Sequence, residues 1–272
     1  MLKAFLRCFA SLPLPLVHGI GVVIGWVMYA LDKKFAKRTW SNIERTRLAS
    51  GAALKRLVHQ SVRETGKGIA ESFVIWFRQP QALIKLVKQC NGWEHVEAAL
   101  AQQHGIIFLT PHLGCFEITA QYYAQQHPMS VLFKPTEQGW LAPLIEEGRG
   151  RSHVKLAPTN MRGIRTLLKS LRDGEAVGIL PDQVPDLGDG VWADFFGIPA
   201  YTMTLVSKLA ETTQAKVLLA YGERLPHGAG YIIHIETLGM EATPQNINDG
   251  IEKMVRERPE QYLWSYRRFK QP

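Results

Sequence analysis

One stretch, residues 105–117, places the strongest constraint on the fold of this chain of 272 residues. The apolar run Ile106–Leu109 has the composition of a buried strand, and Pro111 ends it because proline cannot donate a hydrogen bond to a sheet. Gly114 permits a tight turn, and the residues from Cys115 onward suit a helix. The stretch therefore predicts a strand, a short loop and a helix, as in α/β folds.

His112 and Glu117 lie five positions apart in this stretch. On one continuous helix they would point about 140° apart, at roughly 100° per residue, so they can meet only if His112 lies in the loop before the helix. A carboxylate bonded to one ring nitrogen leaves the other as a base, which makes the two a candidate catalytic pair. Most histidines near strand ends only bond locally, but a loop at this position favours the catalytic interpretation.

Composition limits the class of protein. With 46% hydrophobic and 21% charged residues, the chain is typical of a globular protein. Cys8, Cys90 and Cys115 are far apart and odd in number, which argues against disulfides or a zinc site and suits a reducing compartment. Cys115 is expected to be a small buried residue rather than a nucleophile. No Walker A, dinucleotide or His-Glu-x-x-His motif occurs, so no cofactor and no metal are expected.

The net charge of +8 belongs to the N-terminal quarter of the chain. Residues 1–64 hold eleven Lys or Arg and three Asp or Glu, whereas residues 65–272 hold twenty-one of each. A protein that binds nucleic acid would be basic more uniformly, so no nucleic-acid partner is expected. The basic cluster beside an apolar run indicates contact with anionic lipid headgroups, with a solvated helix face as the alternative.

No charged residue lies between Cys8 and Leu31, and a membrane-spanning helix needs about 20 mostly apolar residues. Basic residues flank this stretch on both sides: Lys3 and Arg7 before it, and Lys33, Lys34, Lys37 and Arg38 after it. The heavier charge after the stretch predicts that the rest of the chain is cytoplasmic. A cleaved signal peptide is disfavoured because no cleavage site of the Ala-x-Ala type precedes the basic cluster.

Pro13, Pro15 and His18 weaken the first half of the apolar stretch, so it either spans the membrane or lies in the interface. We expect residues 1–35 to form an N-terminal membrane anchor with a basic flank. Residues 36–272 are expected to form a single α/β domain.

Residues 36–79 carry apolar side chains three and four positions apart, which predicts helix up to the break at Gln79-Pro80. Strands and helices then alternate. The expected strands are Ile106–Leu109, Ser130–Phe133, Ala176–Leu180, Lys216–Ala220 and Tyr231–Ile235. The expected helices are Phe116–Gln126, Trp140–Arg149, Met161–Arg172, Thr202–Glu211 and Asn246–Arg258. This order predicts a mixed, partly parallel central sheet flanked by helices, with the N-terminal membrane-anchoring helix attached.

Polar residues at the ends of other elements are expected to converge with His112. Lys134 follows a strand, and Asp182 follows another strand that ends in a proline. Asp182 would orient a basic partner or a substrate hydroxyl, or would only satisfy a local turn. Arg149 and Arg151, with glycines around them, suit a planar fork for phosphate; a basic helix end capped by glycine is an equal alternative.

The aromatic segment 190–204 is expected to be a loop that leads into a helix capped by Thr202. Phe195, Phe196 and Met203 in this segment would either wall an acyl channel or form plain core.

Several motifs, in order and over nearly the whole chain, resemble the lipid A biosynthesis late acyltransferases, the lauroyl and myristoyl transferases of Gram-negative bacteria. These motifs are Thr110-Pro-His-x4-Glu117, Gly148-Arg149, Leu180-Pro-Asp-Gln183, the aromatic segment Val191–Thr204 and the ending Pro259–Lys270. The family is part of the lysophospholipid acyltransferase superfamily. Three positions depart from the pattern: Pro111, where many superfamily members have Asn; Glu117, where the glycerolipid enzymes more commonly have Asp; and Tyr266, where the family often has His. No catalytic role is assigned to Tyr266.

The resemblance implies a reaction and its site residues. A fatty acyl chain moves from acyl carrier protein to a hydroxyl of a Kdo-bearing lipid A precursor, at the cytoplasmic face of the bacterial inner membrane. His112 and Glu117 match the catalytic pair, Arg149 matches an arginine that binds acceptor phosphate, and Asp182 matches an acidic position of glycerolipid enzymes. Arg151 and Lys134 are expected to assist Arg149.

In the expected mechanism, Glu117 orients His112, which removes the acceptor hydroxyl proton as the oxygen attacks the thioester. Backbone N–H groups at the start of the following helix would stabilise the oxyanion. One alternative is an acyltransferase acting on a lysophospholipid or another glycolipid. A more distant one is a non-catalytic, membrane-bound lipid-binding protein.

Overall fold

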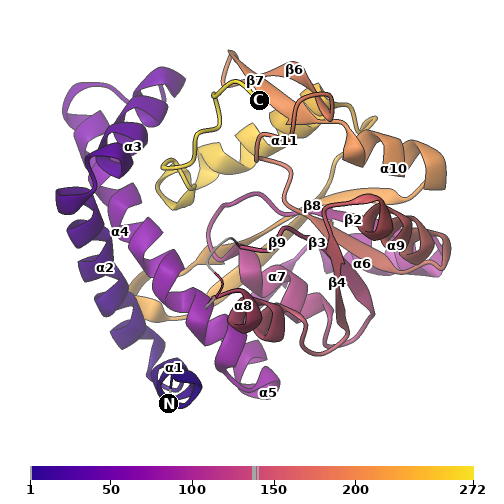
Figure 1. Cartoon of the computed structure of the whole chain (residues 1–272), viewed down its shortest axis with the longest axis horizontal. Coiled ribbons are helices and arrows are strands. Elements are labelled where there is room, and N and C mark those ends of the chain that lie inside the picture. Colours follow the sequence, from indigo (N-terminus) through magenta and orange to yellow (C-terminus); the bar gives the residue numbers. More distant parts are fainter. Residues whose placement is uncertain (1, 137–138, 140) are drawn as a thin grey trace.

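The computed structural model describes residues 2–136, 139 and 141–272 of the chain, and a seven-stranded sheet lies at its centre (Figure 1). The strand order is β1-β9-β8-β2-β5-β3-β4, and neighbours are parallel except for β8 and β9. The strands of this sheet are β1 (Val87–Asn91), β2 (Ile106–Leu109), β3 (Met129–Phe133), β4 (Val154–Pro158), β5 (Ala176–Ile179), β8 (Lys216–Arg224) and β9 (Tyr231–Thr237). The predicted α/β class with a partly parallel sheet is confirmed.

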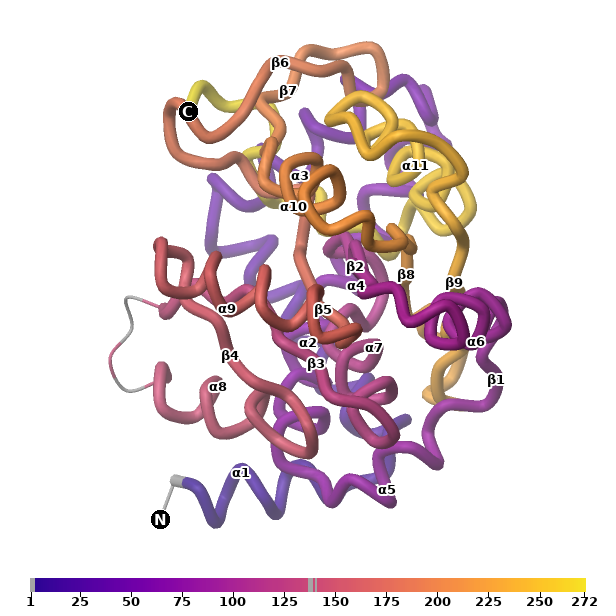
Figure 2. The backbone as a smooth tube through the Cα atoms, turned by 90° about the vertical axis from the view of Figure 1, so that its right-hand side faces the viewer, coloured from indigo at the N-terminus to yellow at the C-terminus, as the bar shows by residue number. Residues whose placement is uncertain are grey.

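Helices cover both faces of the sheet and extend along one side of it. The first five are α1 (Leu2–Ala10), α2 (Leu14–Leu31), α3 (Lys33–Thr46), α4 (Gly51–Phe77) and α5 (Pro80–Ile84). The others are α6 (Trp93–Ala101), α7 (Phe116–Tyr123), α8 (Ala142–Arg149), α9 (Met161–Arg172), α10 (Leu205–Thr213) and α11 (Pro244–Glu257), with 3₁₀ turns at Pro226–Gly228 and Pro259–Gln261. Figure 2 shows α1 and α5 at one end of the molecule, and α11 with the pair of strands β6 (Gly190–Phe195) and β7 (Ile198–Met203) at the other.

Strand β2 lies inside the sheet and is buried on both faces. Ile107 and Leu109 join the core formed with α9, α10 and α11, whereas Ile106 and Phe108 join the core formed with α6 and α7. A strand covered on both sides reads as a continuous apolar run, which explains why β2 was recognisable in the sequence. Its predicted bounds, Ile106–Leu109, are confirmed.

The sequence prediction missed the two edge strands, β1 and β4. Strand β1 has the sequence Val-Lys-Gln-Cys-Asn and is half exposed, and β4 buries only Val154 and Ala157. Edge strands need little apolar surface, so they carry a weak hydrophobic signal. The helix expected from Trp140 begins at Ala142 in the structure, and Trp140 itself lies outside the described residues.

The aromatic segment 190–204 is a β-hairpin, which corrects the predicted loop. Strands β6 (Gly190–Phe195) and β7 (Ile198–Met203) pair antiparallel around Phe196 and Gly197, both with positive φ. A two-residue turn of this kind matches the twist of the strands. The next helix begins at Leu205, so Thr202 does not cap it. Phe195 and Phe196 are buried in the core, which favours the plain-core interpretation over an acyl channel.

The N-terminal helices lie along α4 (Figure 1). Pro13 separates α1 from α2, and α2 is long and apolar enough to cross a membrane, with a mean hydropathy of 1.8 and 28% of its residues buried. Its buried side approaches α4 through glycines. A Cβ on Gly25 would lie 2.2 Å from the carbonyl oxygen of Val62, and one on Gly66 would lie 2.0 Å from that of Gly21.

Buried charges also join α2 to the body. Glu71 on α4 accepts hydrogen bonds from Arg224 Nε of β8 at 2.9 Å and Tyr231 Oη of β9 at 3.0 Å, and lies 3.1 Å from His18 Nε2 of α2. Glu64 accepts a further bond from Arg224 at 2.7 Å. Burial opposes ionisation of Glu71, but the Arg224 guanidinium outweighs burial and lowers the pKa of this carboxyl to about 2.

The glycine contact between α2 and α4 predicts opposite effects for two equivalent substitutions. Gly25→Ala should lower the free energy of unfolding by about 1–3 kcal/mol, because the new methyl group overlaps the backbone of α4. Gly19→Ala on the same helix has nothing within 4 Å and should be neutral or stabilising by up to about 1 kcal/mol. Urea unfolding in detergent micelles measures both. Equal stability of the two variants would show that α2 does not pack as described.

The ionised state of Glu71 predicts an acid-dependent loss of stability. Because its folded pKa of about 2 lies below the ordinary value of 4.5, its contribution is complete above pH 4.5 and is lost as the pH falls toward 2. Over this range the unfolding free energy of the wild type should fall by on the order of 3 kcal/mol more than that of Glu71→Gln. The exposed Glu97→Gln serves as the control and should follow the wild type. Parallel curves for the wild type and Glu71→Gln would contradict the assignment.

Candidate active site

His112 lies in the loop between β2 and α7, as the sequence predicted, and Asp182 holds it at two points. Asp182 Oδ1 is 2.8 Å from His112 Nδ1, and Asp182 Oδ2 accepts the backbone N–H of His112 at 2.9 Å. Strands β2 and β5 are adjacent and parallel, so the residues that follow them meet at the same edge of the sheet. Nδ1 is therefore the nitrogen that donates to Asp182, and in the neutral ring Nε2 carries the lone pair.

The Asp182 side chain is 3% exposed, and burial opposes its ionisation. Attraction to the His112 ring and the two hydrogen bonds from His112 outweigh burial, so the pKa of the Asp182 carboxyl lies below its ordinary value. The His112 side chain is 11% exposed and packs against the ring of Phe116, with 4.8 Å between the ring centres. The ring is thus fixed in one orientation by a charged partner.

The prediction that Glu117 orients His112 is wrong in this geometry. Glu117 does lie in the first turn of α7, but its carboxylate accepts hydrogen bonds from Arg149 Nε at 2.8 and 3.1 Å, and a third from Arg149 Nη2. Helix α7 directs Glu117 toward the end of α8 rather than back to the loop. The carboxylate on His112 comes instead from the neighbouring strand.

Arg149 is the last residue of α8, and Glu117 fixes its guanidinium. The group lies 5.6 Å from the centre of the Phe133 ring and 6.0 Å from that of Trp76. Burial opposes the charge, but the Glu117 carboxylate raises the pKa of Arg149 above its ordinary value. Its side chain remains 25% exposed, so a fixed, partly accessible cation lies against the first turn of α7, the helix that follows the histidine loop.

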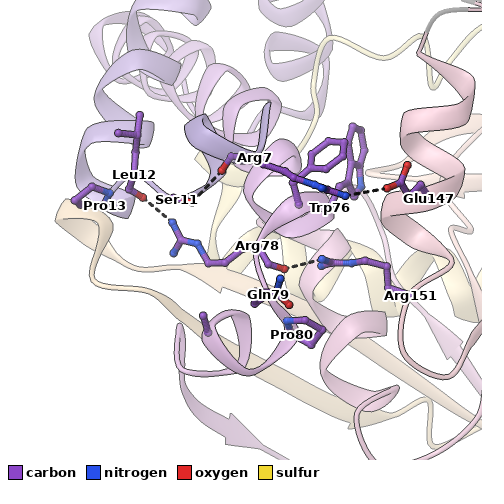
Figure 3. Close-up of a pocket in the computed structure, with 12 residues that line it drawn as sticks. Arg7, Ser11, Leu12, Pro13, Trp76, Arg78, Gln79, Pro80, Glu147 and Arg151 are labelled. Carbon is purple, nitrogen blue, oxygen red and sulfur yellow. Dashed lines mark hydrogen bonds and ion pairs between the residues drawn. The ribbon is translucent and has the colours of Figure 1, made fainter. Parts of the chain in front are cut away.

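Arg151 does not form a phosphate fork with Arg149. Its Nη1 donates to the carbonyl oxygen of Arg78 at 2.6 Å and its Nη2 donates to that of Ile75, so it closes the C-terminal end of α4 (Figure 3). The alternative of a basic helix end capped by glycine describes Arg149 and Gly150 at the end of α8, whereas Arg151 bonds the end of another helix, α4. Its Nε makes no hydrogen bond to other described residues.

Lys134 follows β3 and is exposed, at the same edge of the sheet as His112 and Asp182. Among the described residues, no hydrogen bond or ion pair joins Lys134 to His112, Asp182 or Arg149. The structure therefore places Lys134 near the site by topology alone.

The backbone of the histidine loop is fully engaged. The N–H of Leu113 donates to Pro111 O at 2.7 Å, that of Gly114 to Gln261 O at 3.0 Å, and that of Cys115 to Gly222 O at 2.8 Å. These three groups and the N–H of His112 are therefore not available to a substrate oxyanion, whereas the donors expected from the sequence lie beyond them, at the start of α7 from Phe116 onward. Cys115 is 2% exposed, and burial holds the pKa of its thiol well above the ordinary value, so it is the small buried residue that was expected.

Sequence reasoning gave no role to Gln183, although it directly follows Asp182. Its side-chain Nε2 lies 3.2 Å from His112 Nε2. The next backbone N–H, of Val184, donates to Tyr266 Oη at 2.9 Å, which ties this loop to the C-terminal segment. The sequence signal that could have indicated Gln183 is its position directly after Asp182, at the end of a buried strand.

The pockets on the surface do not by themselves identify the His112–Asp182 site. A hollow of about 740 Å³ lies between α1 and the ends of α4 and α8, where Figure 3 shows Arg7 extending toward Glu147. A small cavity of about 40 Å³ lies beneath α7, beside Glu117 and Arg149. Within the described ranges, no three His, Cys, Asp or Glu side chains converge as metal ligands do. The hydrogen bonds around His112 identify the site more directly than cavity size.

Comparison with known proteins identifies the relatives of this chain. The family model described as bacterial lipid A biosynthesis acyltransferase matches residues 1–271. A lipid A biosynthesis lauroyltransferase of Escherichia coli (strain K12) is 26% identical over 269 residues, covering 96% of this chain and 87% of the relative. A lipid A biosynthesis palmitoleoyltransferase of the same strain is 27% identical over 280 residues, with the same coverage. A lipid A biosynthesis acyltransferase of Haemophilus influenzae is 25% identical and covers 98% of this chain and 88% of the relative.

Because Glu117 bonds Arg149 and not His112, the structure predicts which of these pairs is energetically coupled. In a double-mutant cycle, Glu117→Gln and Arg149→Gln should couple by roughly 1–3 kcal/mol in unfolding free energy, because either substitution alone leaves a charge without its partner. Glu117→Gln and His112→Ala should be closer to additive, since no hydrogen bond joins them. A stronger coupling between Glu117 and His112 than between Glu117 and Arg149 would restore the original pairing.

Proposed function

Because the chain belongs to the family of bacterial lipid A biosynthesis acyltransferases, we propose that it moves a fatty acyl chain from acyl carrier protein to a hydroxyl of a Kdo-bearing lipid A precursor. The lauroyl and palmitoleoyl specificities named for two relatives support a fatty acyl substrate. The observation that carries the proposal is the Asp182–His112 pair, in which the carboxylate bonds Nδ1 and leaves Nε2 on the other side of the ring, at the carboxyl edge of the sheet.

The proposed mechanism assigns one proton and one bond to each step. His112 Nε2 removes the proton of the acceptor hydroxyl while its oxygen attacks the thioester carbonyl carbon. The tetrahedral intermediate collapses as the C–S bond breaks, and the imidazolium returns the proton to the departing thiolate. Asp182 stabilises the imidazolium between these steps. General-base assistance of this kind contributes about 10²–10⁴-fold.

Arg149 is proposed to meet a phosphate of the acceptor. Its Nε and one Nη face Glu117, and the partial exposure of the guanidinium supports contact with a ligand on its remaining side. The exposed Lys134 supplies a second positive charge at the same edge of the sheet. Arg151 is omitted from the proposed site because its two terminal nitrogens bond backbone carbonyl oxygens.

Helix α2 is proposed to anchor the protein at the inner membrane, with the acyltransferase body at the cytoplasmic face. The side of α2 away from α4 exposes Leu16, Val23, Val27 and Leu31. Lys33, Lys34 and Lys37 follow directly and are exposed, which suits anionic lipid headgroups.

Two other functions are kept as alternatives. The first is acyl transfer to a lysophospholipid or another glycolipid, which uses the same site and differs only in the acceptor. The second is lipid binding without catalysis, which the oriented His112 does not favour, because a binding protein has no need of a buried carboxylate fixing an imidazole tautomer.

A direct test measures acyl transfer by the purified protein from a defined acyl carrier protein thioester to a tetraacylated, Kdo-bearing precursor. His112→Ala and Asp182→Asn should lower kcat by about 10²–10⁴-fold, because the base or its orienting charge is lost. The exposed Asp186→Asn, four residues from Asp182, is the matched control and should retain wild-type activity.

The alternatives give different results in the same assay. Transfer to lysophospholipids but not to the Kdo-bearing precursor would retain the acyltransferase and replace the acceptor. Full activity of both His112→Ala and Asp182→Asn would overturn the proposed mechanism.

A further inference from the structure

The nitrogen proposed as the base already has a hydrogen-bond partner. When Asp182 accepts a hydrogen bond from Nδ1–H of the neutral ring, Nε2 is an acceptor, and the Gln183 amide nitrogen at 3.2 Å can only donate to it. An acceptor hydroxyl must occupy this same position before it can give up its proton. Binding of the substrate therefore displaces the Gln183 amide from Nε2.

The displaced amide remains beside the reacting atoms. Asp182 is buried and the N–H of Val184 is bound by Tyr266, so the backbone on both sides of Gln183 is fixed. The Gln183 side chain itself is exposed and free to rotate about its own bonds. Its NH₂ group thus stays within a side-chain rotation of the atom that attacks the thioester.

The reaction needs a hydrogen-bond donor at this place. When the hydroxyl oxygen attacks, the carbonyl π electrons move to the thioester oxygen, which becomes an oxyanion. The backbone N–H groups of residues 112–115 donate to Asp182, Pro111, Gln261 and Gly222 and are not available, which leaves those at the start of α7 as backbone donors near the loop. Arg149 is a cation already paired with Glu117. The Gln183 amide is a neutral donor whose present partner the substrate replaces.

We infer that Gln183 is a further catalytic residue: its amide occupies His112 Nε2 in the free enzyme and donates to the thioester oxyanion once the acceptor hydroxyl has taken its place. The inference rests on the proposed function of His112 as the base. It assigns Gln183 no part in orienting the imidazole, which Asp182 performs from the other side of the ring.

The test compares Gln183→Leu, Gln183→Glu and the control Gln102→Leu in the full-length protein. Gln102 is exposed at the end of α6, before β2, and so lies at the opposite end of the sheet from His112. Release of the thiol of acyl carrier protein is measured with the tetraacylated, Kdo-bearing precursor and with lysophospholipids as acceptors. Gln183→Leu should lower kcat by about 10²-fold, the typical cost of losing one oxyanion donor, while KM for the acyl thioester and the melting temperature stay close to the wild-type values.

Gln183→Glu gives a readout that a purely structural role would not move. A carboxylate beside Nε2 stabilises the imidazolium, so the acid limb of the pH–rate profile should move to higher pH, in addition to the loss of kcat. Gln183→Leu introduces no charge, so its acid limb should move less than that of Gln183→Glu. Gln102→Leu should match the wild type in rate, profile and melting temperature.

The outcomes separate this inference from the proposed function. Wild-type kcat in Gln183→Leu, with His112→Ala inactive, would overturn the role of Gln183 and leave the proposed function standing. Wild-type activity in His112→Ala would overturn the base assignment and the inference with it. Absence of thiol release by the wild type with every acceptor would reject both.

Discussion

The two-point bond between Asp182 and His112 is the interaction on which the site depends. One carboxylate oxygen binds the imidazole and the other binds the backbone N–H of the same residue, so the ring and the loop that carries it are fixed together. This arrangement requires β2 and β5 to be neighbours and parallel, because only then do the residues after both strands meet. It also requires the carboxylate to stay ionised although buried, and the imidazole and the N–H provide the compensation that burial demands.

The same loop is held from the other side by the end of the chain. Gly114 adopts a φ of 59° and donates to Gln261, at a place where a Cβ would lie 2.1 Å from the carbonyl oxygen of Gly222. The Gln261 side chain pairs with the backbone of Arg224, whose guanidinium binds Glu71 of α4, and Glu71 in turn contacts His18 of α2. Contacts therefore run without a break from the apolar N-terminal helix to the histidine loop. The helix proposed to meet the membrane and the proposed catalytic base belong to one packed structure.

The sequence was informative where a residue's environment follows from its neighbours in the chain. The buried strand β2, the loop position of His112 and the start of α7 each depend on local apolar runs, a proline and a glycine. It failed where the partner comes from a distant segment. The spacing of His112 and Glu117 suggested a bond between them, but Asp182 arrives from the adjacent strand, and Arg149 arrives from the end of α8. Spacing along the chain limits which residues can meet; it does not decide which of them do.

The two carboxylates, Asp182 and Glu117, thus have different partners. Asp182 bonds the ring and sets which nitrogen is basic, whereas Glu117 bonds a guanidinium and fixes a cation close to the same edge of the sheet. Glu117 and Arg149 neutralise each other, whereas Asp182 faces a neutral imidazole and is kept ionised by the two hydrogen bonds from His112 and by the nearby Arg268 guanidinium. This division also explains how a His-x4-Glu motif can mark an active site without being a hydrogen-bonded pair. Loss of Glu117 would displace Arg149, and a loss of activity on that account would resemble the loss of a base-orienting residue. Only the separate energetic coupling of each carboxylate to its own partner distinguishes the two roles.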